Sequence, residues 1–292
     1  MQSRLRLMSF LVAVAGTTSM AQGANVNEFI DFSLRSGATV LLPGRLYVPP
    51  EAQADPSQPR PLIVFLHGGG DAGTNNVAQL NQNIDDLFAE AKRRGAFLLA
   101  PQAPLNWRPR TVTDRAVAMM DKALQDYNVD ANRLYLTGYS SGGGGTWNML
   151  SRYPDRFAAA VPVAPVSTEP DFAPANLVGQ PIMTFHARND GIAPVQTTRN
   201  VINSILYAAH KTLPAYPTLQ NPAEFIFSAP DLDLHYVEPA VGDHSVLFSV
   251  YDRPALYDWL FAHSLVPEPS GAGLLLVAAI ILPKITRRVP SL

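Results

Sequence analysis

The sequence predicts an α/β protein with a mostly parallel central sheet and helices on both faces. Five short, continuous apolar runs carry this prediction: PLIVFLHGGG, GAFLLAPQAP, NRLYLTGYS, FAAAVPVAP and QPIMTFHARND. Such runs are expected of parallel strands that are buried on both faces. Segments with helical spacing of apolar residues alternate with the runs, and this alternation favours a parallel sheet between two helical layers.

Four segments are predicted to be helical: residues 77–93, 113–127, 195–209 and 245–263. In the first of them Leu80, Ile84, Leu87 and Ala91 recur at the spacing of one helical face. Functional groups in such folds lie on loops beyond the carboxyl ends of the strands, so the end of each predicted strand is where chemistry is expected.

Composition and charge exclude several classes of protein. The chain has 292 residues, 47% of them hydrophobic, a formal net charge of −2 and no cysteines. This is the composition of a globular domain, and no overall charge attracts the chain to nucleic acid. Without cysteines, an exported protein would fold without disulfides and would depend on its core alone.

Both ends of the chain differ from the middle. Residues 1–23 combine Arg4 and Arg6, an apolar run and small residues, which is the order of a secretory signal peptide with cleavage after Ala21 or Gly23. Residues 266–292 join the motif VPEPS, a short apolar run at 271–282 and a pair of arginines. This order resembles the PEP-CTERM sorting tail of Gram-negative bacteria, which implies a short membrane helix and an encounter with sorting machinery at the inner membrane. The run is shorter than the roughly 20 residues of a spanning helix, so a helix packed on the domain is the alternative.

Removal of these ends leaves residues 24–265 as one predicted catalytic domain. Within it the stretch GYSSGGGG matches the G-x-S-x-G pattern of a nucleophile elbow between a predicted strand and a predicted helix. The turn is strained, and flanking glycines relieve its crowding. Ser140 has glycine two residues before and two residues after it, whereas the residue two positions before Ser141 is Tyr139. Ser140 is therefore the predicted nucleophile.

A serine nucleophile needs a base and an acid that orients the base, and the chain order for this architecture is Ser, then Asp or Glu, then His. Asp190 directly follows a predicted strand and is the preferred acid, with a helix cap as its alternative role. Asp171, Asp231 and Asp233 are weaker candidates because they lie in Pro-rich or poorly placed segments.

His244 lies in the loop VGDHSVLF between a strand-like stretch and the last predicted helix, and it is the preferred base. His235 is the second choice. It alternates with Leu234 and Tyr236 in the strand-like stretch, a pattern that favours a side chain that faces solvent or packs. His210 and His263 lie at predicted helix ends, where favourable interaction with the helix dipole is the simpler explanation.

Two backbone N–H groups should form the oxyanion hole. The loop LHGGGD provides Gly69 as one donor, and Ser141 provides the other because it follows the nucleophile. Trp107, after another predicted strand, is a candidate for substrate contact, with packing under a surface loop as the alternative. The sequence contains no metal-binding spacing such as H-E-x-x-H and no Gly-Lys-Ser/Thr phosphate loop, so no metal or cofactor is expected.

With these residues in place, residues 61–261 resemble the α/β-hydrolase superfamily, in particular prokaryotic carboxylesterases and feruloyl or polyhydroxybutyrate esterase-like proteins. The segment 127–164, which contains GYSSGGGG and YPDRFAA, carries the strongest match. The resemblance implies an α/β-hydrolase fold and a triad of Ser140, Asp190 and His244. The family usually has Met at the position of Ser141 and a bulky residue at the position of Gly144, which predicts open space beside the nucleophile here.

The sequence thus predicts an exported serine hydrolase that cleaves small-molecule or polymeric carboxylic esters through an acyl-enzyme. Two alternatives stay open: a peptidase or other acyl transferase with the same triad, and an inactive, surface-attached binding protein. The protein would be exported from a Gram-negative bacterium, anchored transiently at the inner membrane and then found at the cell surface or outside the cell. Whether residues 212–230 cap the site, and which ester is cleaved, are left open.

Overall fold

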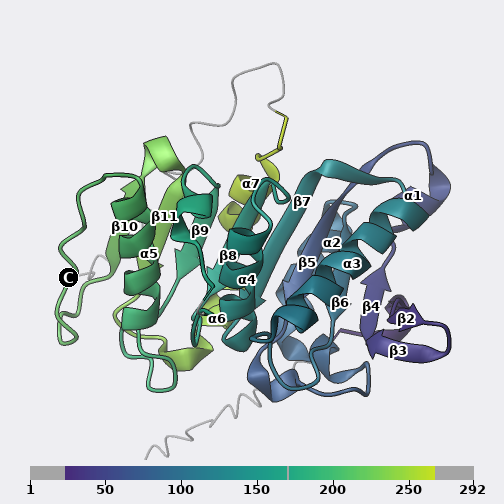
Figure 1. The fold of residues 1–292 in the computed structure, drawn as a ribbon, viewed down its shortest axis with the longest axis horizontal. Helices are drawn as coiled ribbons and strands as arrows, with labels where there is room; N and C mark the ends of the chain where they lie inside the picture. The colour runs from purple at the N-terminus through teal and green to yellow at the C-terminus, as the bar shows by residue number, and fades with distance from the viewer. Residues whose placement is uncertain (1–23, 170, 267–292) are drawn as a thin grey trace, which may run out of the picture.

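The computed structural model of the chain describes residues 24–169 and 171–266, and a nine-stranded sheet forms its centre (Figure 1). The strands of this sheet are β1 (Ile30–Asp31), β4 (Gly44–Tyr47), β5 (Arg60–Leu66), β6 (Phe97–Pro101), β7 (Val129–Tyr139), β8 (Ala159–Val163), β9 (Ile182–Phe185), β10 (Phe225–Ala229) and β11 (Leu234–Glu238). Their order across the sheet is β1-β4-β6-β5-β7-β8-β9-β11-β10. The six strands from β6 to β11 in this order are parallel, and β4, β1 and β10 are antiparallel additions at the two edges.

Helices cover both faces of the sheet. They are α1 (Pro50–Ala54), α2 (Asp85–Arg93), α3 (Arg110–Asp126), α4 (Ser141–Arg152), α5 (Gln196–Ala208), α6 (Val246–Tyr251) and α7 (Pro254–Phe261). Figure 1 shows α3, α4 and α5 in front of the sheet, with α2, α6 and α7 behind it. A separate hairpin of β2 (Leu34–Ser36) and β3 (Thr39–Leu42) lies beside the β4 edge.

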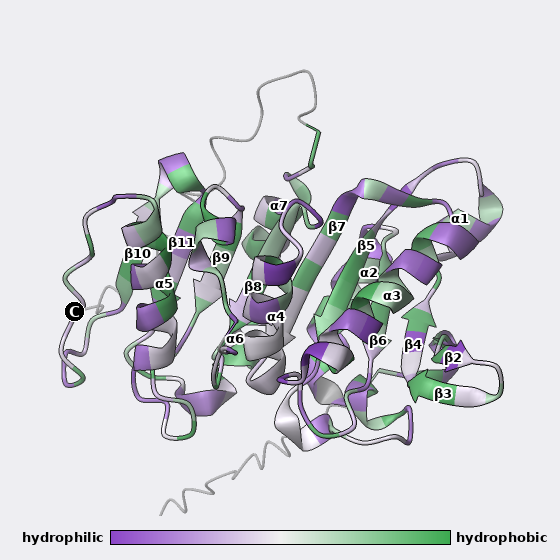
Figure 2. Ribbon diagram, viewed as in Figure 1, coloured by the Kyte–Doolittle hydropathy of each residue, from purple (hydrophilic) through white to green (hydrophobic). Residues whose placement is uncertain are grey.

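The central strands divide the apolar core into two layers. Along β5, Leu62 and Val64 belong to the core under α3, α4 and α5, whereas Ile63 and Phe65 belong to the core under α2, α6 and α7. Side chains alternate between the faces of a strand, so a strand covered on both sides needs apolar residues at every position. Figure 2 shows the result as green strands behind helices whose turns toward the viewer are partly purple.

The predicted fold class is confirmed, and the five apolar runs form β5, β6, β7, β8 and β9. Two helix predictions are wrong in extent. The segment 77–93 begins as two short 3₁₀ helices, and α2 starts only at Asp85. Asn81 accepts a hydrogen bond from the backbone N–H of Asn83, and such local side-chain bonds compete with helical ones. The segment 245–263 is split into α6 and α7 at Pro254, which lacks an N–H and begins a new helix.

The predicted signal peptide, residues 1–23, and the predicted tail from residue 267 onward, with its membrane helix at 271–282, lie outside the described residues. Among the helices that are described, none combines the length and the apolar character needed to cross a membrane.

Candidate active site

Ser140 occupies the sharp turn between β7 and α4. Its backbone has φ 57° and ψ −114°, a conformation that residues other than glycine rarely adopt and that costs roughly 1–3 kcal/mol. Three hydrogen bonds hold it: Ser140 N–H donates to Val163 O over 2.9 Å, and Ser140 O accepts from Gly144 N–H and Val166 N–H. The turn therefore fixes the serine side chain at the carboxyl end of the central strand.

Glycines let this turn pack against its neighbours. A Cβ on Gly142 would lie 1.8 Å from Leu66 O, so only glycine lets α4 approach β5 this closely. A Cβ on Gly144 would lie 2.3 Å from Ser167 O. The prediction of open space at Gly144 is therefore wrong, because the backbone of the loop after β8 fills that space.

The structure brings three predicted residues together from three loops. His244 Nε2 lies 2.9 Å from Ser140 Oγ, and His244 Nδ1 lies 2.7 Å from Asp190 Oδ2. Ser140 follows β7, Asp190 lies on the loop after β9, and His244 lies on the loop after β11. These strands are parallel, so their carboxyl ends meet at one edge of the sheet.

Hydrogen bonds keep Asp190 ionised although its side chain is buried. Burial pushes the pKa of Asp190 up, but bonds from His186, His244, Ala193 and Ile192 outweigh this and hold the pKa well below its ordinary value. Ile192 N–H and Ala193 N–H both donate to Oδ1 over 2.8 Å. An ionised carboxylate only accepts, so His244 Nδ1 carries the hydrogen and Nε2 is free to accept from the Ser140 hydroxyl.

The alternative role of Asp190 as a cap of α5 does not fit the geometry. The residue before α5 is Val195, which makes no side-chain capping bond, and the Asp190 carboxylate instead closes the turn over Ile192 and Ala193.

Residues beside the triad connect the loops that carry it. Tyr139, next to the nucleophile, donates its hydroxyl hydrogen to His244 O over 2.7 Å. Asp243 N–H donates to Asn189 Oδ1, and Asp243 Oδ1 accepts from Gly191 N–H over 3.2 Å. The loops of the acid and the base are thus joined on either side of the Asp190–His244 contact. The sequence prediction missed these residues, since their partners are distant along the chain.

The two predicted oxyanion donors lie at the starts of helical turns. Ser141 is the first residue of α4 and Gly69 is the first of a short 3₁₀ helix, Gly69–Asp71, after β5. Within the described residues, neither backbone N–H has a protein acceptor. A Cβ on the preceding Gly68 would lie 3.8 Å from Ser140 Cβ, so this glycine loop passes directly beside the nucleophile.

Trp107 is not exposed to a substrate, which argues against the predicted contact. Its side chain is completely buried, its Nε1–H donates to His67 O over 3.0 Å, and its backbone N–H donates to Ser141 Oγ over 3.2 Å. Burial lowers the pKa of His67 to about 4, so this imidazole is neutral, with Nδ1 bonded to Gly68 O and Nε2 accepting from Ala103 N–H. Trp107 and His67 therefore hold the glycine loop in place through hydrogen bonds to its backbone.

The weaker acid and base candidates lie elsewhere. His235 is buried in β11, its Nε2 is 3.0 Å from Asp233 Oδ1, and the other oxygen of Asp233 contacts His263. Asp171 pairs with Arg152 and Asp231 with Lys211 at the surface. None of these side chains is bonded to Ser140.

The segment before β10 is held by a buried ion pair. Glu238 accepts hydrogen bonds from Arg188 and Arg199, which donate in turn to backbone oxygens of Asn221, Ala223 and Pro217. These contacts join residues 217–223 to β11, the strand next to the edge strand β10, and to α5.

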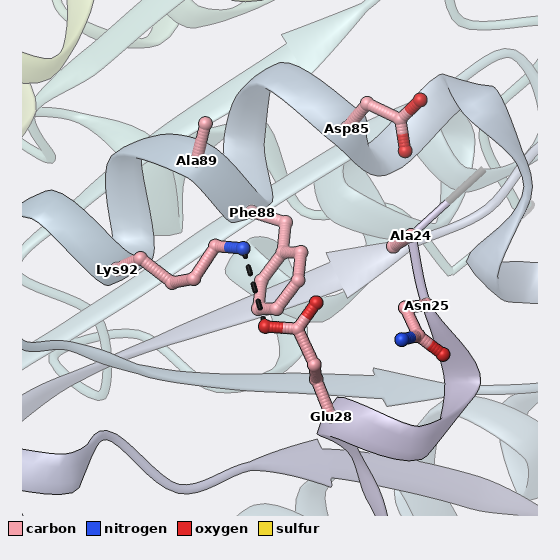
Figure 3. A pocket seen from close by; sticks show the side chains of 7 residues that line it. All are labelled: Ala24, Asn25, Glu28, Asp85, Phe88, Ala89 and Lys92. Atoms are coloured by element: carbon pink, nitrogen blue, oxygen red, sulfur yellow. Dashed lines mark hydrogen bonds and ion pairs between the residues drawn. The ribbon is translucent and has the colours of Figure 1, made fainter. Parts of the chain in front are cut away.

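The pocket in Figure 3 is separate from the triad. It is lined by Ala24, Asn25, Glu28, Asp85, Phe88, Ala89 and Lys92, from the first described residues and α2. Its ion pair of Lys92 and Glu28 is solvent-exposed. Over the described part of the chain, no three His, Asp or Glu side chains are arranged to hold a metal ion.

A family model described as PET hydrolase-like matches residues 111–234, less than half of the chain. The match includes Ser140 and Asp190 and ends before His244. Acetylxylan esterase A of Emericella nidulans is 40% identical over 148 residues, which are 46% of this chain and 46% of that protein. A bifunctional acetylxylan esterase/xylanase of Neocallimastix patriciarum is 26% identical over 58% of this chain and 26% of its own length. The chain spans less than half the length of these curated relatives.

Solved structures show the same architecture. A thermostable esterase superposes with a TM-score of 0.66 at 26% identity, covering 82% of this chain and 64% of that chain. An acetyl xylan esterase from Aspergillus awamori superposes with a TM-score of 0.54 at 15% identity, covering 70% of this chain and 89% of that chain. With its parallel sheet, two helical layers and serine at the strand-to-helix turn, the chain has the α/β-hydrolase fold.

Proposed function

We propose that the protein is a serine hydrolase that cleaves carboxylic esters through an acyl-enzyme. The continuous hydrogen-bonded chain from Ser140 Oγ through His244 to Asp190 supports this proposal most directly. It starts at a strained strand-to-helix turn, where a serine side chain is presented to a substrate.

In the proposed reaction, Ser140 Oγ attacks the ester carbonyl while His244 Nε2 takes the hydroxyl proton. Asp190 accepts from Nδ1–H throughout, which keeps the correct tautomer and stabilises the imidazolium. The imidazolium then protonates the departing alcohol as the C–O bond breaks, leaving the acyl group on Oγ. Water attacks this acyl group by the same proton transfers and releases the carboxylic acid, so the enzyme returns to its starting state.

The backbone N–H groups of Gly69 and Ser141 are the proposed donors to the oxyanion. Both lie at helix starts beside Ser140 and have no acceptor among the described residues. Removing one such donor costs about 3–4 kcal/mol of transition-state stabilisation in enzymes of this type.

The curated relatives support an ester as substrate, since both are named acetylxylan esterases, and the matching family model is described as PET hydrolase-like. We therefore propose a panel of acetyl, long-acyl, feruloyl, polyhydroxybutyrate, acetylated xylan and aromatic polyester substrates to find the preferred ester.

The first test is hydrolysis of p-nitrophenyl acetate by the purified protein. Ser140→Ala is expected to lose activity to the background rate. Ser141→Ala is the matched control: its hydroxyl accepts from Trp107 N–H, and the proposed role belongs to its backbone, so most activity should remain. Equal rates for Ser140→Ala and the parent would refute the proposal, and cleavage of peptides but not esters would favour a peptidase.

We also propose export, with residues 1–23 removed and residues 266–292 acting as a sorting tail. One relative, from Arthroderma benhamiae, is named an uncharacterized secreted protein. Mass spectrometry of the exported protein should find Gln22 or Ala24 at its N-terminus. A reporter carrying residues 266–292 should fractionate with the inner membrane, and the same reporter without the apolar run should not.

A further inference from the structure

Two histidines, not one, contact the carboxylate of Asp190. His186 is the residue directly after β9, and its side chain is completely buried, as is that of Asp190. His186 Nε2 lies 3.2 Å from Asp190 Oδ2, the same oxygen that His244 Nδ1 approaches to 2.7 Å. The proposed triad of Ser140, Asp190 and His244 does not include His186, so this second contact is additional to it.

The neighbours of His186 define which nitrogen carries its hydrogen. Nε2 faces two acceptors, Asp190 Oδ2 and Ala193 O, the latter at 2.9 Å, so Nε2 is the donor. Nδ1 lies 2.8 Å from Thr198 Oγ1, whose hydroxyl can donate to it. A neutral imidazole therefore satisfies every contact: its single N–H donates to Ala193 O and also lies 3.2 Å from the Asp190 carboxylate.

Through these contacts His186 links α5 to the loop that carries Asp190. One side of the ring is fixed to Thr198 in α5, and the other is fixed to the loop at Ala193. Asp190 is thereby held from both sides: two backbone N–H groups fix Oδ1, while the two imidazoles fix Oδ2. With three hydrogen bonds and the His186 Nε2–H 3.2 Å from Oδ2, the carboxylate has little freedom to rotate away from His244.

We propose that His186 is a positioning residue that orients the Asp190 carboxylate toward His244 and shares its charge. This inference rests on the proposed function, because it assigns a role in the same reaction. Other groups near the Asp190–His244 contact are Tyr139, whose hydroxyl bonds to His244 O, and Asp243, whose carboxylate accepts from His244 N–H.

Removing the His186 donor should change catalysis in a defined direction. A hydrogen bond to a charged group is worth about 1.5–3 kcal/mol, which corresponds to a loss of roughly 10- to 160-fold in kcat. The substrate does not touch Asp190 in the proposed reaction, so KM should change little. The expected loss therefore lies in kcat, because the orientation of the carboxylate toward His244 is what changes.

The experiment compares His186→Leu, His186→Gln and His235→Leu with the full parent protein. Leucine removes the donor, whereas glutamine places an amide N–H the same number of bonds from Cα as Nε2. His235 is the matched control, since it is a buried histidine bonded to an aspartate outside the triad. We expect His186→Leu to lower kcat with KM nearly unchanged, His186→Gln to recover kcat, and His235→Leu to affect stability alone.

A second measurement separates this inference from the proposed function. The ¹H and ¹⁵N resonances of His244 Nδ1–H report its bond to Asp190 without any substrate. We expect these resonances to shift in His186→Leu, to return in His186→Gln and to stay unchanged in His235→Leu. If the parent hydrolyses no ester but the resonances respond in this way, the proposed function fails and the positioning role stands. If His186→Leu is less stable but keeps the parent's kcat and resonances, His186 is only a packing residue and the inference is wrong.

Discussion

Replacing Asp190 with asparagine tests the proposed triad at the point where its hydrogen bonds are best defined. The substitution keeps the shape of the side chain but changes one acceptor into a donor. Two backbone N–H groups donate to Oδ1, so the amide oxygen of the new side chain should take that place. This leaves the NH₂ group opposite His244 and His186, and the His186 Nε2–H keeps Ala193 O as its acceptor. If the amide were flipped, its NH₂ group would face the N–H groups of Ile192 and Ala193, and both hydrogen bonds would be lost at a cost of about 1 kcal/mol each.

In this orientation His244 must accept at Nδ1 and carry its hydrogen on Nε2. It would then donate to Ser140 and could not take the proton of the nucleophile. The same change in a well-studied serine protease lowers kcat by about 10⁴, which corresponds to roughly 5.4 kcal/mol at 1.36 kcal/mol for each factor of ten. We expect a loss of about this size for Asp190→Asn, with KM nearly unchanged.

The assay is kcat for p-nitrophenyl acetate, with circular dichroism to show that each variant is folded. Asp243→Asn is the matched control, since it makes the same charge change one residue from His244. Asp243 Oδ1 accepts both of its backbone hydrogen bonds, and an amide oxygen can replace it there, so less than about a tenfold loss is expected. If Asp190→Asn keeps a tenth of the parent's kcat, or if both variants lose the same activity, the tautomer argument is refuted.

Two further predictions concern stability, each measured by chemical denaturation. Gly142→Ala should destabilise the protein by about 3 kcal/mol or more, because its Cβ would lie 1.8 Å from Leu66 O. Gly70→Ala, with no atom within 4 Å of its Cβ, should change stability by less than about 0.5 kcal/mol, and equal losses would contradict the packing argument. Glu238→Gln should cost about 3–5 kcal/mol, since it leaves the buried Arg188 guanidinium without its carboxylate, and an unchanged unfolding midpoint would contradict this estimate.

The fold was predictable where burial alone determines the sequence pattern. A parallel strand covered on both faces needs apolar residues at every position, and this produced the five runs that form β5 to β9. The strand β11 was predicted only as a strand-like stretch and not as an apolar run, because its residues 234–238 include His235 and Glu238. These two side chains are buried through polar partners rather than through apolar contact. The start of α2 was misplaced for a similar reason, since asparagine side chains replace helical bonds there.

The triad candidates could be chosen because a fixed order along the chain and a place at a strand end reduce the choice to a few residues. His186 also lies at a strand end, but it precedes Asp190 and so falls outside a search for a downstream base. Its position four residues before an aspartate at the end of a buried strand was the only available signal. Its function depends on which nitrogen meets which oxygen, and that is decided by the packing of the β9 loop against α5. Sequence spacing could therefore identify the groups that react, but the groups that hold them in place require the three-dimensional contacts.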